Sequence, residues 1–343
     1  MSSLRDPRQS IQYMLHTAVY DICFSPCGGY IAAANKFGNV ALFSLTAALS
    51  PSVQDEAKCP VYTFNVYKNG GIYSLTSTET ELICAGEGDI QAYQWADIIA
   101  KNPKIVWALS IPKKGVFSHP EINSCVIDSS SDKSTLYAGA GDNNIYAWDI
   151  ESGEYKSCLT GHTDYIHKIS LKDNGQGLVS VSEDGSARIW DLRANEISHI
   201  VKPFEHEMCA RPDLGKWLQC LALDEDNYWL VLGGGPTMSA WHLNTLTPTV
   251  TFDTPGVAQN VAMFYEDKIF SAGNSNVLNH WSLTGEHKMA VPLSPTAVYS
   301  ISINDKSKSN KVMAIAGSSG YVDVCTNFGY KAFSLSFLHP SVY

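Results

Sequence analysis

Short segments in which apolar and polar residues alternate recur along the chain. Seven of them resemble one another, and they read VALFSL, IQAYQW, IYAWDI, ARIWDL, MSAWHL, LNHWSL and VDVCTN. Alternation with a period of two residues is typical of a β-strand with one buried face. A helical period of 3.6 residues is confined to two short candidates, at residues 46–50 and 96–102. The pattern therefore predicts an all-β protein.

The seven segments are spaced as repeats of one structural unit. Each carries an anchor residue, and successive anchors lie 40 to 55 residues apart. The anchors are Phe43, Tyr93, Trp148, Trp190, Trp241, Trp281 and Cys325. This spacing fits four short strands with their turns, which is the blade of a β-propeller.

A second regularity lies eight residues before each anchor. A small residue occupies this position in all seven repeats, namely Asn35, Ala85, Ala140, Ser182, Gly233, Gly273 and Gly317. The inner strands of neighbouring blades converge in a propeller, so we expect a small residue here to let sheet faces pack closely. The two regularities together predict seven blades.

The fourth repeat carries the fullest motif, with GHTDYIH followed by LVSVSEDGSARIWDLR. It resembles the repeats of the WD-repeat (WD40) family. That resemblance implies a buried hydrogen-bonded tetrad whose polar groups satisfy one another. The tetrad positions here are His162, Ser180, Asp184 and Trp190. A catalytic dyad of His162 and Asp184 is the alternative interpretation.

Elsewhere the family motif decays. The third repeat keeps Asp142 and Trp148 but has no evident GH pair, and the seventh has Cys325 in place of tryptophan. The resemblance therefore predicts the fold of the family for the whole chain, but the complete tetrad in one repeat only.

The repeats leave no segment that reads as a linker between domains. We expect residues 11–337 to form a single seven-bladed propeller, with a flexible N-terminal arm at residues 1–10 and a C-terminal tail at residues 338–343. One outer strand has to come from a chain end. Residues 11–17 and 330–337 both alternate well enough to supply it, so the choice stays open.

Charge makes direct contact with nucleic acid unfavourable. The chain has 24 Lys+Arg against 34 Asp+Glu, a formal net charge of −10, and an acidic protein repels phosphate backbones. The one local basic run consists of Lys101, Lys104, Lys113 and Lys114. A solvated surface explains this run better than an RNA contact. The polar N-terminus and the absence of a long apolar run support neither secretion nor a membrane span.

No sequence motif points to catalysis, a cofactor or a metal. The chain lacks GxxxxGK[ST], HExxH, GxSxG and paired CxxC motifs. Its nine cysteines are scattered through apolar segments, which is typical of reduced, buried thiols in a nuclear or cytosolic protein. Cys23 and Cys27 have no second pair at ligand spacing, so we expect no zinc site. Because the catalytic motifs are missing, we also expect no enzyme activity.

The strongest candidate for a binding surface is the stretch FEHEMCARPDLGKW at residues 204–217. Long loops on a rigid scaffold commonly contact partners. Its candidate partner-binding residues are His206, Glu207, Arg211 and Trp217. The alternative is that the loop is a tolerated insertion.

Within the WD-repeat proteins, the segments SPCGGYIAAAN, CARPDLGKW, GGGPTMSAWHL and TNFGYKAFSLSF are similar to the THO complex subunit 6 family. The resemblance implies a non-catalytic scaffold subunit of the nuclear THO/TREX assembly, which supports transcription-coupled mRNA processing, splicing and export. Its partners would be other THO subunits, especially coiled-coil subunits, with RNA association mainly indirect. Self-association within a larger assembly stays open.

A second functional hypothesis comes from the WDxR box formed by Trp190, Asp191 and Arg193. Some propellers with such a box resemble substrate receptors of cullin ubiquitin ligases. The motif has low specificity, because an exposed arginine at a strand end also forms ordinary surface ion pairs.

Overall fold

The computed structural model describes residues 16–50, 55–112, 119–130, 134–304, 306 and 311–337. The predicted arm at residues 1–10 and the predicted tail at residues 338–343 lie outside the described residues. The described part of the chain is almost entirely β-structure.

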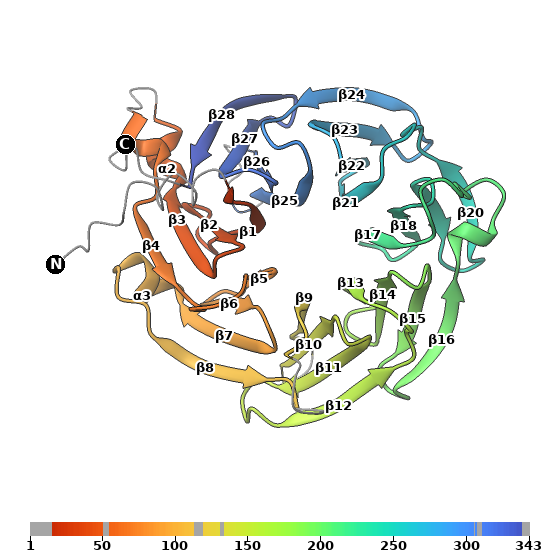
Figure 1. Cartoon of the computed structure of the whole chain (residues 1–343), viewed down its shortest axis with the longest axis horizontal. Coiled ribbons are helices and arrows are strands. Elements are labelled where there is room, and N and C mark those ends of the chain that lie inside the picture. Colours follow the sequence, from red (N-terminus) through yellow and green to blue (C-terminus); the bar gives the residue numbers. More distant parts are fainter. Residues whose placement is uncertain are drawn as a thin grey trace. The chain divides into compact units, whose positions relative to one another are not determined.

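Seven four-stranded sheets form, each from four consecutive strands (Figure 1). Blade 1 consists of β1 (Val19–Phe24), β2 (Tyr30–Asn35), β3 (Asn39–Ser44) and β4 (Tyr62–Asn65), and blade 2 of β5 (Ser74–Ser77), β6 (Glu81–Ala85), β7 (Asp89–Gln94) and β8 (Ile105–Ser110). Blade 3 consists of β9 (Ile122–Asp128), β10 (Thr135–Ala140), β11 (Asn144–Asp149) and β12 (Tyr155–Thr160), and blade 4 of β13 (Ile166–Lys172), β14 (Gly177–Ser182), β15 (Ala187–Asp191) and β16 (Glu196–Val201). Blade 5 consists of β17 (Leu218–Leu223), β18 (Trp229–Gly234), β19 (Ser239–His242) and β20 (Thr247–Thr251). Blade 6 consists of β21 (Gln259–Tyr265), β22 (Lys268–Gly273), β23 (Val277–Ser282) and β24 (His287–Pro292). Blade 7 consists of β25 (Val298–Asn304), β26 (Val312–Gly317), β27 (Tyr321–Thr326) and β28 (Tyr330–Ser336). The prediction of an all-β, seven-bladed propeller is confirmed.

Helical structure in the described residues is limited to short turns. The two helical candidates of the sequence coincide with α2 (Leu45–Ala48) and α3 (Trp95–Ile99). Ser44 caps α2 by accepting a hydrogen bond from the backbone N–H of Ala47 at 3.3 Å. Two 3₁₀ turns, η1 (Asp55–Lys58) and η2 (Pro203–Glu205), complete the set.

The chain divides into two compact units. The first contains residues 1–86, 91–106 and 291–343, and so holds blades 1 and 7 with much of blade 2. The second contains residues 87–90 and 107–290, and so holds blades 3 to 6.

The anchors and small residues occupy equivalent places in every blade. All seven anchors lie on the third strand, and all are buried. The small residues lie at or next to the end of the second strand. We expected these residues to be small so that neighbouring blades could pack closely, and this reason is wrong at two glycines. A Cβ on Gly273 would lie 1.8 Å from the carbonyl oxygen of Ala258, and one on Gly317 would lie 1.9 Å from that of Ala297. The obstacle is therefore the backbone that leads into the first strand of the same blade, not a neighbouring blade.

The first strand of six blades carries a β-bulge close to its N-terminal end. A bulge leaves one residue out of the ladder and redirects its side chain. The residues left out are Tyr20, Asn123, His167, Gln219, Asn260 and Tyr299. The repeat thus gathers polar and aromatic side chains at one end of the inner strands of each unit.

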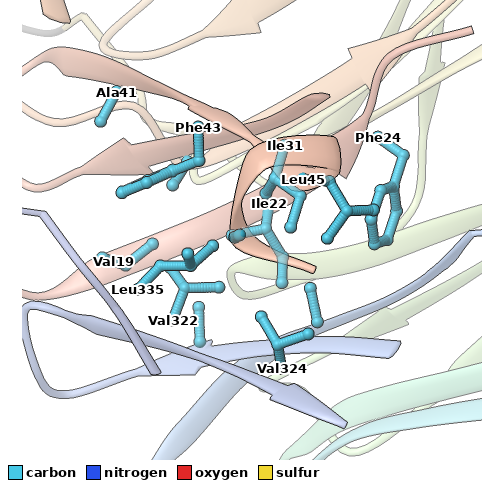
Figure 2. Packing of buried hydrophobic residues seen from close by; sticks show 14 of the residues in the cluster. Val19, Ile22, Phe24, Ile31, Ala41, Phe43, Leu45, Val322, Val324 and Leu335 are labelled. Carbon is cyan, nitrogen blue, oxygen red and sulfur yellow. The ribbon is translucent and has the colours of Figure 1, made fainter. Parts of the chain in front are cut away.

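Within the first unit, blades 1 and 7 pack face to face through one apolar cluster. Figure 2 shows Val19 and Ile22 of β1 beside Val322, Val324 and Leu335 of β27 and β28. All five side chains are almost completely buried. Burying each such side chain stabilises the fold by about 1.5–3 kcal/mol, so this contact holds the first and last blades together, and among the described strands neither blade takes a strand from the other.

The outer strand of blade 7 comes from the C-terminal segment. β28 pairs antiparallel with β27 from Tyr330 to Ser336. Of the two segments that could supply an outer strand, residues 330–337 therefore do so, whereas residues 11–15 lie outside the described residues.

Asp21 connects three blades of the first unit. Its Oδ1 accepts hydrogen bonds from the hydroxyl of Ser300 at 2.6 Å and from the N–H of Ile22 at 2.9 Å. Its Oδ2 accepts one from the N–H of Leu75 at 2.7 Å. Because Ser300 belongs to blade 7 and Leu75 to blade 2, one carboxylate fixes both neighbours of blade 1.

Blade 4 contains a buried polar network at the four tetrad positions. The ring nitrogens of His162 lie 2.8 Å from Ser180 Oγ and 2.8 Å from Asp184 Oδ2. The indole N–H of Trp190 donates to Ser180 Oγ, also at 2.8 Å. A neutral imidazole with its proton on Nδ1 satisfies every donor and acceptor in this chain of bonds. Both ring nitrogens are thereby occupied, which leaves neither for a substrate.

The ionisation of this network follows from burial and hydrogen bonding. Burial lowers the pKa of His162, and it outweighs the opposing effect of Asp184. Burial alone would raise the pKa of Asp184, but hydrogen bonds from His162 and Ser186 lower it well below its usual range. The pair is therefore a neutral histidine and an ionised carboxylate.

Two other blades contain parts of the same network. In blade 6, the indole N–H of Trp281 donates to Ser271 Oγ at 2.9 Å, with the same ten-residue spacing as Ser180 and Trp190. In blade 3, which has no GH histidine, the hydroxyl of Tyr146 donates to Asp142 Oδ2 at 2.5 Å. The turn aspartate thus keeps a buried partner even where the histidine is missing.

Replacing Asp21 with alanine should destabilise the protein by about 1–3 kcal/mol, because it leaves the N–H of Leu75 and the hydroxyl of Ser300 without their acceptor. Urea unfolding monitored by tryptophan fluorescence measures the change. Asp226→Ala, at an exposed turn residue, is the matched control and should change stability by less than about 0.5 kcal/mol. Equal effects of the two substitutions would contradict the role of Asp21.

Replacing Asp184 with alanine should also cost about 1–3 kcal/mol, because it removes the acceptor of a buried imidazole N–H. A thermal melt of the variant and of Asp226→Ala, recorded in the same buffer, tests this. An unchanged melting temperature for Asp184→Ala would show that the network does not stabilise blade 4.

Stability should fall between about pH 6.5 and pH 4 because of His280. Burial, with Lys268 and His287 nearby, lowers the pKa of this side chain to about 4, so in this range the unfolded chain binds a proton that the folded chain does not. His280→Phe should therefore lose stability less steeply than the native protein as pH falls from 7 to 4. Urea midpoints at several pH values measure the slopes, and parallel slopes would exclude this origin. His199→Gln, at an exposed position, serves as the control.

Candidate partner-binding surface

The candidate loop between blades 4 and 5 is an ordered structure anchored by Arg211. The guanidinium of Arg211 donates to the carbonyl oxygens of Gly235 at 3.0 Å, Pro236 at 2.9 Å and Thr254 at 2.8 Å. Longer bonds reach two further carbonyls. Because a guanidinium has five N–H donors in a fixed plane, it can join several backbone segments at once. Arg211 therefore fixes the loop against two connections further along the chain, the one after β18 and the one after β20.

The candidate residue His206 also lies inside the loop. Its ring contacts the indole of Trp241 edge to face, with 6.0 Å between ring centroids. Its Nδ1 is buried without a hydrogen-bond partner in the protein. In the same segment, the carbonyl of Cys209 accepts a hydrogen bond from the N–H of Thr237 at 2.8 Å. These contacts attach the middle of the loop to blade 5.

Glu207 and its neighbour Met208 belong to the exposed surface of the loop, which also includes Glu205, Pro212, Asp213, Gly215 and Lys216. Glu207 is exposed, and Met208 has 52% of its surface accessible. An exposed methionine on a rigid support presents flexible apolar surface to a partner. No sequence motif marks Met208, although its place next to Glu207 in a candidate binding loop is a signal that could have found it.

Trp217 lies at the end of the loop and lines a pocket. Its indole N–H donates to the carbonyl of Leu214 at 3.0 Å, which fixes the ring. The pocket has a volume of about 390 Å³, and its walls include His167, Glu183, Lys216 and Gln219. The structure therefore places the four candidate residues differently: Arg211 and His206 hold the loop, Glu207 faces solvent and Trp217 lines the pocket.

The three residues of the candidate adaptor box are not equivalent. Trp190 is buried in the tetrad, so it is no part of a surface. Arg193 is exposed and forms two hydrogen bonds to Asp191, from Nε at 3.2 Å and from an NH2 group at 2.9 Å. Hydrogen bonds from Arg193 lower the pKa of Asp191 to about 2. An adaptor would have to compete with this pair for the guanidinium.

The candidate basic run is only partly described. Lys101 and Lys104 are exposed beyond α3, and Lys113 and Lys114 lie outside the described residues. The described part of the chain contains no cluster of three or more potential metal ligands. Cys23 is buried in β1 while Cys27 is exposed in the following turn. Among the described helices, none has the length and apolar content needed to span a bilayer.

Comparison with known proteins places the chain in a family. The model of the family "WD domain, G-beta repeat" matches residues 153–191, which run from the outer strand of blade 3 to the tetrad tryptophan strand of blade 4. The chain is 43% identical to a THO complex subunit 6 homolog of Danio rerio over 94% of this chain and 98% of that protein. It is 41% identical to THO complex subunit 6 of Homo sapiens over 94% of each chain. Identity to THO complex subunit 6 of Drosophila melanogaster is 29%, over 88% of this chain. The chain belongs to the THO complex subunit 6 family of WD-repeat proteins.

Proposed function

We propose that this protein is a non-catalytic scaffold subunit of the nuclear THO/TREX assembly, where it supports mRNA processing, splicing and export. The observation that carries the proposal is the similarity to THO complex subunit 6 proteins over 94% of the chain, which includes all seven blades. Similarity of this extent favours a shared partner set over a shared fold alone. The same extent supports treating residues 11–337 as one propeller domain.

The lack of catalysis is proposed from the chemistry of the described side chains. The one His–Asp pair of blade 4 has both imidazole nitrogens engaged with Ser180 and Asp184. Burial raises the pKa of Cys84 and Cys220, which keeps these thiols in their unreactive protonated form. These properties favour a binding role.

The partner-binding surface is proposed to include Glu207 and Met208. Arg211 holds their loop in one conformation, so a partner would meet an ordered surface and lose little entropy on binding. Met208 offers apolar contact area, and Glu207 a charge at its edge. A coiled-coil THO subunit, with alternating apolar and charged positions, is the proposed partner.

RNA association is proposed to be mainly indirect. The net charge of −10 opposes contact with phosphates. Lys101 and Lys104 alone would release few counterions on binding RNA. The partners in the assembly would then bring the protein close to RNA.

The alternative is a substrate receptor for a cullin ubiquitin ligase, which would bind its adaptor through the WDxR box. The exposure of Arg193 favours this alternative. The hydrogen bonds from Arg193 to Asp191 argue against it, because they occupy the guanidinium that an adaptor would bind.

Replacing Glu207 and Met208 together with alanine should reduce recovery of the coiled-coil THO subunits from nuclear extract by about tenfold or more, because truncating a central interface residue typically costs over 1 kcal/mol. Affinity purification followed by quantitative mass spectrometry measures recovery. The matched control, Glu225→Ala with Met289→Ala, removes the same two side-chain types from other exposed positions and should leave recovery unchanged.

Replacing His206, Glu207 and Arg211 together would not separate binding from folding, because Arg211 supports the loop. Arg193→Ala separates the two functions instead. It should keep the THO subunits if the protein is a THO scaffold. Loss of a cullin adaptor with Arg193→Ala, while the Glu207/Met208 variant keeps every partner, would favour the receptor function.

The isolated protein should bind single-stranded RNA weakly, with a dissociation constant above about 1 μM at about 0.15 M salt, because its net charge is −10. Fluorescence anisotropy with a labelled 20-nucleotide RNA measures this. A sub-micromolar dissociation constant that Lys101→Ala with Lys104→Ala weakens would establish direct binding and overturn the indirect role.

A further inference from the structure

We propose that the pocket beside Trp217 holds an arginine side chain from an extended segment of a partner, with the guanidinium against the Glu183 carboxylate and over the Trp217 indole. The pocket lies at the bulged ends of β13 and β17, where His167 and Gln219 leave their ladders. Its volume of about 390 Å³ falls in the range of pockets that take small ligands or single side chains.

Glu183 provides an oriented anion. Its Oε1 lies 3.0 Å from His167 Nε2, and its backbone N–H donates to the carbonyl of Tyr165 at 2.9 Å. The side chain nevertheless keeps 46% of its surface accessible. A carboxylate that is held on one oxygen and open to solvent can accept the paired N–H groups of a guanidinium.

The surroundings of Glu183 add negative potential. Glu121, Asp164 and Glu183 all act on the phenol of Tyr165, whose pKa is raised first by burial and then by these carboxylates. The ring of Tyr165 lies 6.4 Å from that of His167 in the pocket wall, so the field of these acids acts next to the pocket. Cations are favoured in such a field.

Trp217 provides a fixed aromatic face. Its N–H is already used by the carbonyl of Leu214, so the indole offers its π-surface and not a donor. A guanidinium can stack on this face and pair with a carboxylate at the same time, which an ammonium does less well. The combination selects arginine over lysine.

Among the described residues that line the pocket, Lys216 is the one lysine or arginine, and it opposes a positively charged ligand. Its ammonium lies 5.9 Å from the centroid of the Phe204 ring, which gives the charge a partner within the loop. Because Glu183 and Lys216 carry opposite charges, their removal should change the affinity for arginine in opposite directions. Loss of Glu183 should weaken binding, whereas loss of Lys216 should strengthen it.

The inference adds a ligand chemistry to the proposed partner-binding surface and rests on the proposed function only in taking that surface as partner-facing. The test uses the isolated full-length protein and the peptide Ac-Gly-Ser-Arg-Ser-Gly-NH2, so it does not depend on THO recovery. Nitrogen-15 NMR follows the indole N–H of Trp217, which is identified as the signal missing from Trp217→Phe.

The arginine peptide should shift this signal, and the same peptide with neutral citrulline should not. Glu183→Gln should weaken binding about two- to fivefold, which suits a half-exposed ion pair. Lys216→Ala should tighten it, and Glu225→Gln, an exposed charge in another turn, should change nothing. All variants should keep the native pattern of the other amide signals.

Three results would overturn the proposal. They are equal shifts with arginine and citrulline, no shift at about 10 mM peptide, and reversed effects of Glu183→Gln and Lys216→Ala. Tighter binding of a phosphoserine peptide than of the arginine peptide would identify an anion site instead. None of these results would affect recovery of THO subunits, so the two proposals can fail separately.

Discussion

Each blade is a sheet that has to bury both of its faces, and the rest of the structure follows from that requirement. Apolar clusters join blades 1 and 7 and blades 1 and 2 in one unit. Others join blades 3 and 4, blades 4 and 5, and blades 5 and 6 in the other unit. The second strands are consequently buried on both sides, as β14 and β26 are over their whole length. Outer strands such as β24 keep most of their residues exposed.

This requirement explains how much of the fold the sequence could predict. Anchors such as Trp190 and Trp281 pack between neighbouring sheets, so the spacing of the anchors predicted the number of blades. The small residues were equally visible, but the reason for Gly273 and Gly317 was not. A backbone carbonyl leaves no room for a Cβ at these two positions, and a sequence pattern does not indicate the direction of a carbonyl group.

The candidate site was less predictable for the same reason. Arg211 looked like a partner-binding residue because it is charged and lies in a long loop. Its actual contacts are carbonyl oxygens 23 to 46 residues further along the chain, which no side-chain pattern marks. The pair of Ser271 and Trp281 could have been found, since it repeats the spacing of Ser180 and Trp190. The pocket beside Trp217 could not, because His167 and Gln219 reach it only through the bulges in their strands.

The packing of β1 against β27 and β28 has a consequence for the protein while the ribosome is making it. Val19 and Ile22 are synthesised roughly 300 residues before Leu335, which covers them. Throughout translation one apolar face of blade 1 has no native cover. Contacts between such distant parts of a chain also form slowly, because a long loop must close first. This apolar face of blade 1 therefore stays without its native partner until β28 has left the ribosome.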